Sequence, residues 1–154
     1  MYQLPYWVWP TVLLTVCALA VWRGRDDERL AAGGQLANWA LSILLVRTTT
    51  GGVASSGPQW GVLAADAAFL ILLLWIALRS DRYWPLFAAA FHLLVVSVHI
   101  GRIVDPRISG WAYITAGLVF AYLVLVTIGY GAWTAPRHDG ASARLSEDPG
   151  ATRR

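Results

Sequence analysis

The stretch that decides how many times this chain crosses a membrane is LAAGGQLANWALSILLV, residues 30–46. It is mainly apolar, but it contains Gln35 and Asn38 and two consecutive glycines, Gly33 and Gly34. It is also slightly shorter than the ~20 residues that a helix needs to cross ~30 Å of hydrocarbon. Hydropathy alone therefore leaves open whether residues 30–46 cross a bilayer or lie at its surface.

Four further stretches are long, apolar and nearly free of charge: 4–22, 61–78, 85–104 and 108–133. Hydrophobic residues make up 57% of the chain and charged residues 14%, against roughly 45–50% and 25% in ordinary soluble domains. We therefore expect an all-α membrane protein, in which residues 1–133 form one bundle of transmembrane helices with short connections. Residues 134–154 are polar, and we expect a disordered cytoplasmic tail there.

The distribution of arginine distinguishes four crossings from five. All twelve basic residues are Arg, which is typical of a GC-rich bacterial genome. If residues 30–46 cross the membrane, nine arginines lie on one face and three on the other; if they do not, the division is six against six. Cytoplasmic segments are enriched in basic residues, so five crossings are predicted, with the N-terminus outside and the C-terminus inside a bacterial inner (cytoplasmic) membrane. The three outer arginines are then Arg47, Arg102 and Arg107.

The links between the apolar stretches are mostly short. Residues 79–82 and 105–107 join the last three stretches, and residues 23–29 join the first two. Such short links predict that these helices are antiparallel neighbours. Trp and Tyr gather at the predicted helix ends, where aromatic residues meet a membrane interface, and we interpret Tyr113 as part of the outer aromatic belt.

Ionisable side chains at membrane depth are rare and often functional, so each is a candidate site residue. The candidates are Arg47, Asp66, His92, His99, Arg102 and Asp105. We expect Asp66 to pair with Arg47 or Arg102 and so to fix the register of the helices. The alternative is a carboxylate that carries a proton or binds a cation.

His92 and His99 are seven residues apart, and Arg102 follows three residues later, so all three share one helix face that should point into the bundle. The two imidazoles are ~10 Å apart along the helix axis, too far to bind one metal ion together. We expect neutral histidines that form hydrogen bonds to other helices, for example to Asn38 or Gln35. A proton relay through both histidines and Asp66 stays open as an alternative, as does haem binding with a ligand from a second subunit.

Small residues spaced by four suggest where helices pack closely, because membrane helices associate at such positions. These pairs either pack within the bundle or meet another subunit, and Gly117 and Ala121 are our candidate for such a contact. The pairs are Gly33 and Ala37, Ala64 and Ala68, Ser97 and Gly101, and Gly117 and Ala121.

No sequence motif of an enzyme, a metal site or a phosphate-binding loop occurs, and the single cysteine, Cys17, has no partner for a disulfide. We therefore expect a non-enzymatic protein without a cofactor or bound metal and without nucleic-acid binding. Its partners would be the lipid bilayer and either another membrane protein or further copies of itself. We expect an accessory or assembly subunit of a membrane complex. The main alternative is a small oligomeric transporter or channel, proton-coupled through Asp66 and His92 or His99, and an enzyme acting on lipid is a third class.

Overall fold

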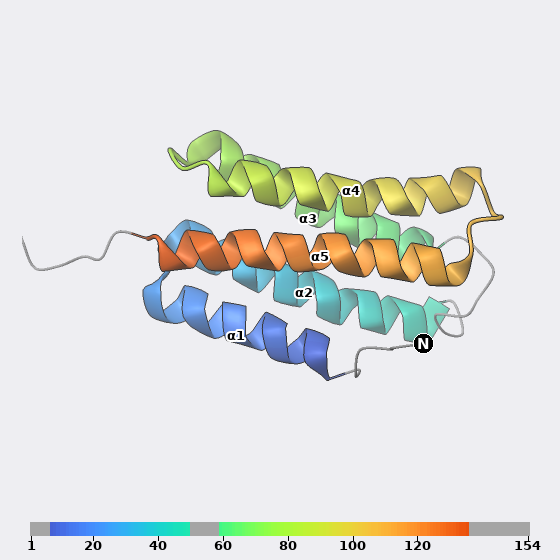
Figure 1. Cartoon of the computed structure of the whole chain (residues 1–154), viewed down its shortest axis with the longest axis horizontal. Coiled ribbons are helices and arrows are strands. Elements are labelled where there is room, and N and C mark those ends of the chain that lie inside the picture. The colour runs from blue at the N-terminus through green and yellow to red at the C-terminus, as the bar shows by residue number, and fades with distance from the viewer. Residues whose placement is uncertain (1–6, 50–58, 136–154) are drawn as a thin grey trace, which may run out of the picture.

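Five α-helices make up the structure, a computed structural model that describes residues 7–49 and 59–135. Each helix runs antiparallel to the next (Figure 1). We call the end that contains the α1–α2 and α3–α4 links the Arg82 end, and the opposite end the Tyr113 end. The helices are α1 (Val8–Arg23), α2 (Asp26–Thr49), α3 (Trp60–Arg79), α4 (Trp84–Val104) and α5 (Gly110–Trp133).

The all-helical fold and the five helical stretches are confirmed, but α2 is longer at both ends than predicted. It begins four residues before Leu30, with Asp26, Asp27 and Glu28 in its first turn. Acidic side chains there interact favourably with the positive end of the helix dipole, so the charged link folds into the helix. The predicted disordered tail falls almost entirely on residues 136–154, which lie outside the described residues.

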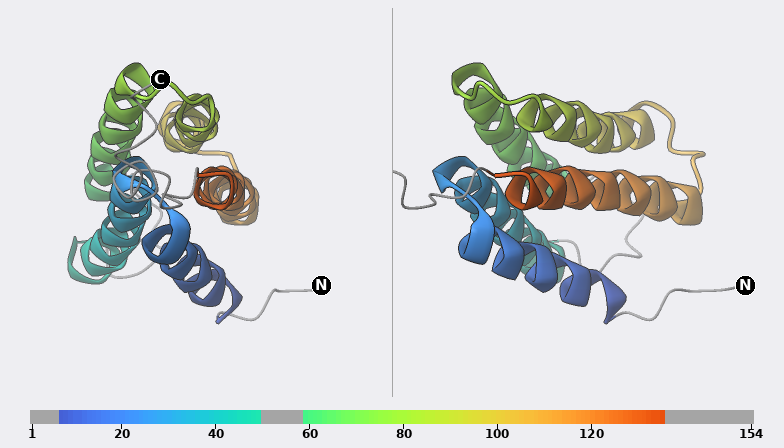
Figure 2. Two further views of the ribbon diagram at one scale, coloured as in Figure 1. Left: turned by 90° about the vertical axis from the view of Figure 1, so that its left-hand side faces the viewer. Right: turned by 60° about the vertical axis from the view of Figure 1, so that its left-hand side comes forward.

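The helices form a ring in which each contacts the next and α1 contacts α5, while α2 also touches α5 across the ring. Figure 2 shows this arrangement nearly end-on. The predicted antiparallel neighbours, α1 with α2 and α3 with α4 and α5, are confirmed.

Three of the helices, α3, α4 and α5, are long and apolar enough to cross a membrane. The apolar helix α1 has 16 residues, which correspond to about 24 Å of helix axis. The helix α2 has 24 residues but opens with a run of charged residues. The structure is consistent with membrane residence, and five crossings stay a prediction.

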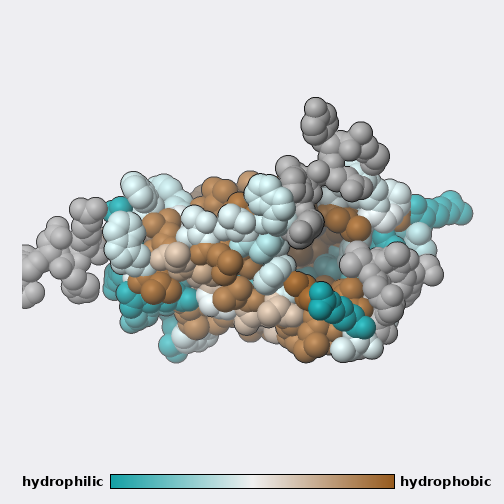
Figure 3. All heavy atoms as spheres, turned by 90° about the horizontal axis from the view of Figure 1, so that it is seen from below, coloured by the Kyte–Doolittle hydropathy of each residue, from teal (hydrophilic) through white to brown (hydrophobic). Residues whose placement is uncertain are grey.

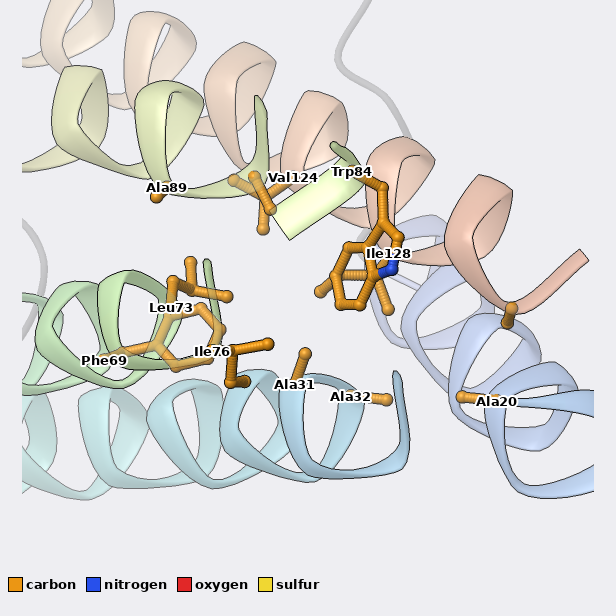
Figure 4. Close-up of a cluster of buried hydrophobic side chains, with 12 residues drawn as sticks. Ala20, Ala31, Ala32, Phe69, Leu73, Ile76, Trp84, Ala89, Val124 and Ile128 are labelled. Atoms are coloured by element: carbon orange, nitrogen blue, oxygen red, sulfur yellow. The ribbon is translucent and has the colours of Figure 1, made fainter. Parts of the chain in front are cut away.

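The buried core lies toward the Arg82 end, where side chains from all five helices meet (Figure 4). Two glycines allow helices to approach closely there. A Cβ at Gly131 of α5 would lie 2.7 Å from the indole of Trp84 on α4, and a Cβ at Gly34 of α2 would lie 2.7 Å from Leu72 on α3. At Gly131 the rigid indole leaves no room for a larger side chain, whereas at Gly34 the ends of Leu72 and Phe69 would have to shift.

The predicted small-residue pairs do not make these contacts. Gly33, Ala37, Ala64, Ala68 and Ser97 are exposed, and Gly101, Gly117 and Ala121 are half-buried. A Cβ at Gly33 or Gly117 would meet no atom within 4 Å. The prediction that these pairs pack within the bundle is therefore wrong for most of them, because alanine and glycine occupy every face of these helices.

The outer surface of the bundle is mainly apolar. Figure 3 shows one face, on which hydrophobic residues and residues of intermediate hydropathy share the middle and most strongly hydrophilic residues lie toward the two ends. Large exposed side chains in the middle of the helices include Leu14, Ile71, Leu93 and Val119. Such a surface matches a lipid environment better than water.

Candidate functional site: the Asp66 network

Asp66 is buried in the bundle, with 4% of its surface exposed, and both carboxylate oxygens have partners on other helices. Asn38 of α2 donates a hydrogen bond from Nδ2 to Asp66 Oδ1 at 2.8 Å. Nε2 of His99 on α4 lies 2.8 Å from Asp66 Oδ2. The carboxylate therefore joins α2, α3 and α4 at one point.

His92 lies closer to the Arg82 end than His99 does, and it is almost completely buried. Its Nε2 lies 3.0 Å from the backbone carbonyl oxygen of Asp66 and 3.8 Å from the carboxylate oxygen Oδ1. A carbonyl oxygen only accepts hydrogen bonds, so Nε2 carries the proton. The ring of Phe69 packs edge-on against this imidazole, with the ring centroids 4.8 Å apart.

A hydrogen-bonded chain continues from His99 to α5. The hydroxyl of Tyr113 lies 2.8 Å from His99 Nδ1. Because His99 Nε2 donates to the carboxylate, Nδ1 of a neutral imidazole accepts from the Tyr113 hydroxyl. The guanidinium of Arg102 stacks on the Tyr113 ring, 4.7 Å from its centroid, which is a favourable cation–π arrangement.

The structure brings together four of the six predicted site residues and leaves two outside. Asp66, His92 and His99 are in direct contact, and Arg102 joins them through Tyr113. Arg47 is exposed near the end of α2. Asp105 is also exposed, and its carboxylate accepts the backbone N–H of Arg107 in the turn after α4.

The predicted arginine partner of Asp66 is wrong, since the partners among the described residues are Asn38, His92 and His99. Arg47 lies nine residues beyond Asn38 on α2, which is about 14 Å along the axis and too far to reach the carboxylate. The prediction that His92, His99 and Arg102 share one inward face of α4 is correct. The expected partners of the histidines are not, because Asn38 binds Asp66 instead.

A second buried polar cluster, which the sequence analysis missed, lies at the Arg82 end. Glu28 is 1% exposed, forms an ion pair with Arg82 and accepts the backbone N–H of Arg25 at 2.8 Å. Arg82 also donates to the carbonyl oxygen of Gly131 at 3.0 Å and to Thr134 Oγ1 at 2.6 Å. These contacts join the α1–α2 link, the α3–α4 link and the end of α5.

The spacing of residues on α2 contained a signal for this cluster. Its buried positions are 28, 31, 32, 35 and 38. These positions recur every three or four residues, as on one face of a helix. Glu28 therefore shares the inward face of Asn38, although residues 23–29 were predicted to form a link between helices.

An apolar layer separates the two polar clusters. On α3, Phe69, Leu73 and Ile76 follow Asp66 and are buried, and on α5 the same level is filled by Val124 and Ile128 (Figure 4). The layer extends ~10 Å along α3 from Phe69 to Ile76. On α2 and α4 it is completed by Ala31, Ala32, Ala88 and Ala89. The described side chains thus form no continuous polar path between the ends.

A cavity of about 250 Å³ adjoins the Asp66 network on the side of α5. His99 and Tyr113 line it together with apolar residues of α3, α4 and α5, including Gly117 and Ala121. Gly117 and Ala121 thus form a notch in the outer surface of α5, and this notch is part of the cavity that His99 and Tyr113 line.

Within residues 7–49 and 59–135, no group of three or more His, Cys, Asp or Glu side chains could hold a metal ion. Comparison of the chain with protein-family models, curated proteins and solved structures finds no match. What the site can do therefore rests on its own geometry.

Proposed function

We propose that the chain is a five-crossing protein of a bacterial inner membrane that acts by intramembrane helix–helix interaction, as an accessory or assembly subunit of a membrane complex. The observation that carries this proposal is the outward orientation of the small residues. Gly33, Ala37, Ala64 and Ala68 are exposed, and the notch at Gly117 is empty. Small residues on a lipid-facing surface let another helix approach closely.

The inside of the bundle supports a binding role over a conducting one. Asp66 has hydrogen-bonding partners from other helices on both carboxylate oxygens, and the apolar layer from Phe69 to Ile76 lies between this carboxylate and the Arg82 end. In this arrangement the Asp66 network acts as a clamp that fixes the register of α2, α3, α4 and α5. The outer faces are then free to bind a partner.

The proposed topology places the Arg82 end in the cytoplasm. Among the described residues, five arginines lie at the Arg82 end and three at the Tyr113 end, the bias expected of a cytoplasmic face. The five are Arg23, Arg25, Arg29, Arg79 and Arg82. A reporter enzyme fused after Gly52 should be active outside the cytoplasm, and a cytoplasmic signal there would reject the topology.

The partner interaction is tested by extracting the tagged chain from native membranes in mild detergent and resolving it on a native gel. We expect a complex larger than the monomer. Gly33→Ile combined with Gly117→Ile should shift the chain to the monomer, because isoleucine adds bulk at two positions where a Cβ would meet no atom of the bundle within 4 Å. Val119→Ile, which enlarges an exposed residue elsewhere on α5, should leave the complex intact. A solitary monomer in every case would refute the proposal.

A second candidate, a small oligomeric transporter or channel, is favoured by the chain of hydrogen bonds from Tyr113 through His99 to Asp66. Histidine titrates near neutral pH, so such a chain can pass protons. In vesicles that contain the purified protein, this function predicts a pH-dependent flux that Asp66→Asn abolishes while the helical content is unchanged. Absence of flux from the unaltered protein would exclude it.

A further inference from the structure

Two side-chain oxygens inside the bundle have no hydrogen-bond donor. Gln35 Oε1 and Asn38 Oδ1 are buried, and neither has a partner within the part of the chain that the structure describes. The two residues are 4% and 9% exposed. A buried carbonyl oxygen without a partner destabilises a fold, so each of these oxygens is expected to have a donor or a bound ligand.

The Asn38 side chain contacts the Asp66 carboxylate, and Gln35 is its neighbour on the same helix face. Gln35 and Asn38 lie one turn apart on the buried face of α2, where side chains three residues apart are neighbours. The amide of Asn38 already donates from Nδ2 to Asp66 Oδ1 at 2.8 Å, which holds its Oδ1 beside the carboxylate. Two amide side chains with unpartnered oxygens thus lie next to one another on the buried face of α2, and one of them contacts the Asp66 carboxylate.

The negative charge of the Asp66 carboxylate also lacks an arginine partner within the described ranges. Among the described basic residues, only the imidazoles of His92 and His99 lie within 4.0 Å of the Asp66 carboxylate. Arg102 is three residues beyond His99 on α4, and its guanidinium stacks on the Tyr113 ring instead of pairing with the carboxylate. When the two histidines are neutral, the buried carboxylate therefore has no cationic side chain within ion-pair distance among the described residues, and an unpaired buried charge is strongly unfavourable.

We propose that Gln35 Oε1, Asn38 Oδ1 and the Asp66 carboxylate bind a small monovalent cation of the Na⁺ class inside the bundle. Amide and carboxylate oxygens are hard ligands that suit hard cations. A single carboxylate balances one positive charge, whereas Ca²⁺ and Mg²⁺ sites usually contain more carboxylates or phosphates. A water molecule would satisfy the two amide oxygens but would leave the carboxylate charge unbalanced. The site lies inside the bundle and does not depend on the proposed partner surface.

The test uses the purified full-length chain in detergent, with NaCl replaced stepwise by choline chloride at constant ionic strength. We expect the melting temperature to rise saturably with Na⁺ but not with choline, because a ligand that binds only the folded state stabilises it. Direct binding of ²²Na⁺ should saturate at one ion per chain.

The matched variants are Gln35→Leu and Ser97→Ala. Gln35→Leu removes one ligand and an unpaired oxygen, so it should fold at least as well in choline chloride and bind ²²Na⁺ roughly tenfold more weakly or worse. Ser97 is exposed and its hydroxyl bonds only to its own helix, so Ser97→Ala should keep the full Na⁺ response. Equal melting temperatures of the unaltered protein in both salts, or an unchanged ²²Na⁺ affinity in Gln35→Leu, would overturn the proposal. Saturable binding by the unaltered protein is measured whether or not the variant folds.

Discussion

Replacement of His99 by phenylalanine tests the Asp66 network most sharply. Phenylalanine keeps a ring beside Tyr113, whose centroid lies 5.3 Å from that of the imidazole, but it removes the donor to Asp66 Oδ2 and the acceptor of the Tyr113 hydroxyl. Hydrogen bonds to a charged group contribute roughly 1.5–3 kcal/mol and neutral ones about 1 kcal/mol. We therefore expect His99→Phe to lower the free energy of unfolding by about 3 kcal/mol.

The assay is unfolding in detergent, followed by circular dichroism. For a chain of this length, about 3 kcal/mol corresponds to a fall in melting temperature of roughly 6–12 °C. In an Asp66→Leu background the charged partner is absent, so the same His99→Phe substitution should cost about 1 kcal/mol. The reasoning is refuted if His99→Phe has no effect in the unaltered chain, or if the loss is equally large in both backgrounds.

Two further substitutions test the Arg82 end. Glu28→Gln removes the charge that pairs with Arg82, whose side chain is 23% exposed. This substitution should lower the free energy of unfolding by about 2 kcal/mol, less than the 3–5 kcal/mol that breaking a fully buried pair costs. An unchanged urea midpoint would argue against this ion pair. Gly131→Ala places a Cβ 2.7 Å from the Trp84 ring and should destabilise the bundle by about 1–3 kcal/mol. The matched control is Gly129→Ala, where the added Cβ would lie 3.7 Å from its nearest neighbour. This variant should be neutral or stabilising by up to ~1 kcal/mol. Equal melting temperatures of the two variants would contradict the α4–α5 contact at Gly131.

The helices could be predicted because apolar stretches of fixed length leave few alternatives. Residues 61–78 and 85–104 fall within one or two residues of α3 and α4. The spacing of seven between His92 and His99 also gave the correct inward face. Such periodicity shows which residues share a face of one helix, and it needs no knowledge of the neighbouring helices.

The partners across helices could not be predicted in the same way. Asp66 faces Asn38 and His99 instead of an arginine, because the contact depends on how far α2 and α4 slide relative to α3. Tyr113 was interpreted as part of an aromatic belt, yet its hydroxyl reaches His99 from the first turn of α5. Composition shows that these residues suit an interface, and only the packing of α4 against α5 shows which atoms they meet.

If the outer face of α5 binds another protein helix, site-specific photo-crosslinking in native membranes should capture that helix. A photoreactive residue is placed at position 117, in the notch, or at position 119, on a different face of the same helix. We expect a protein adduct of defined mass from position 117 that is weak or absent from position 119. Adducts to lipid alone at position 117, or equal protein adducts from both positions, would contradict it.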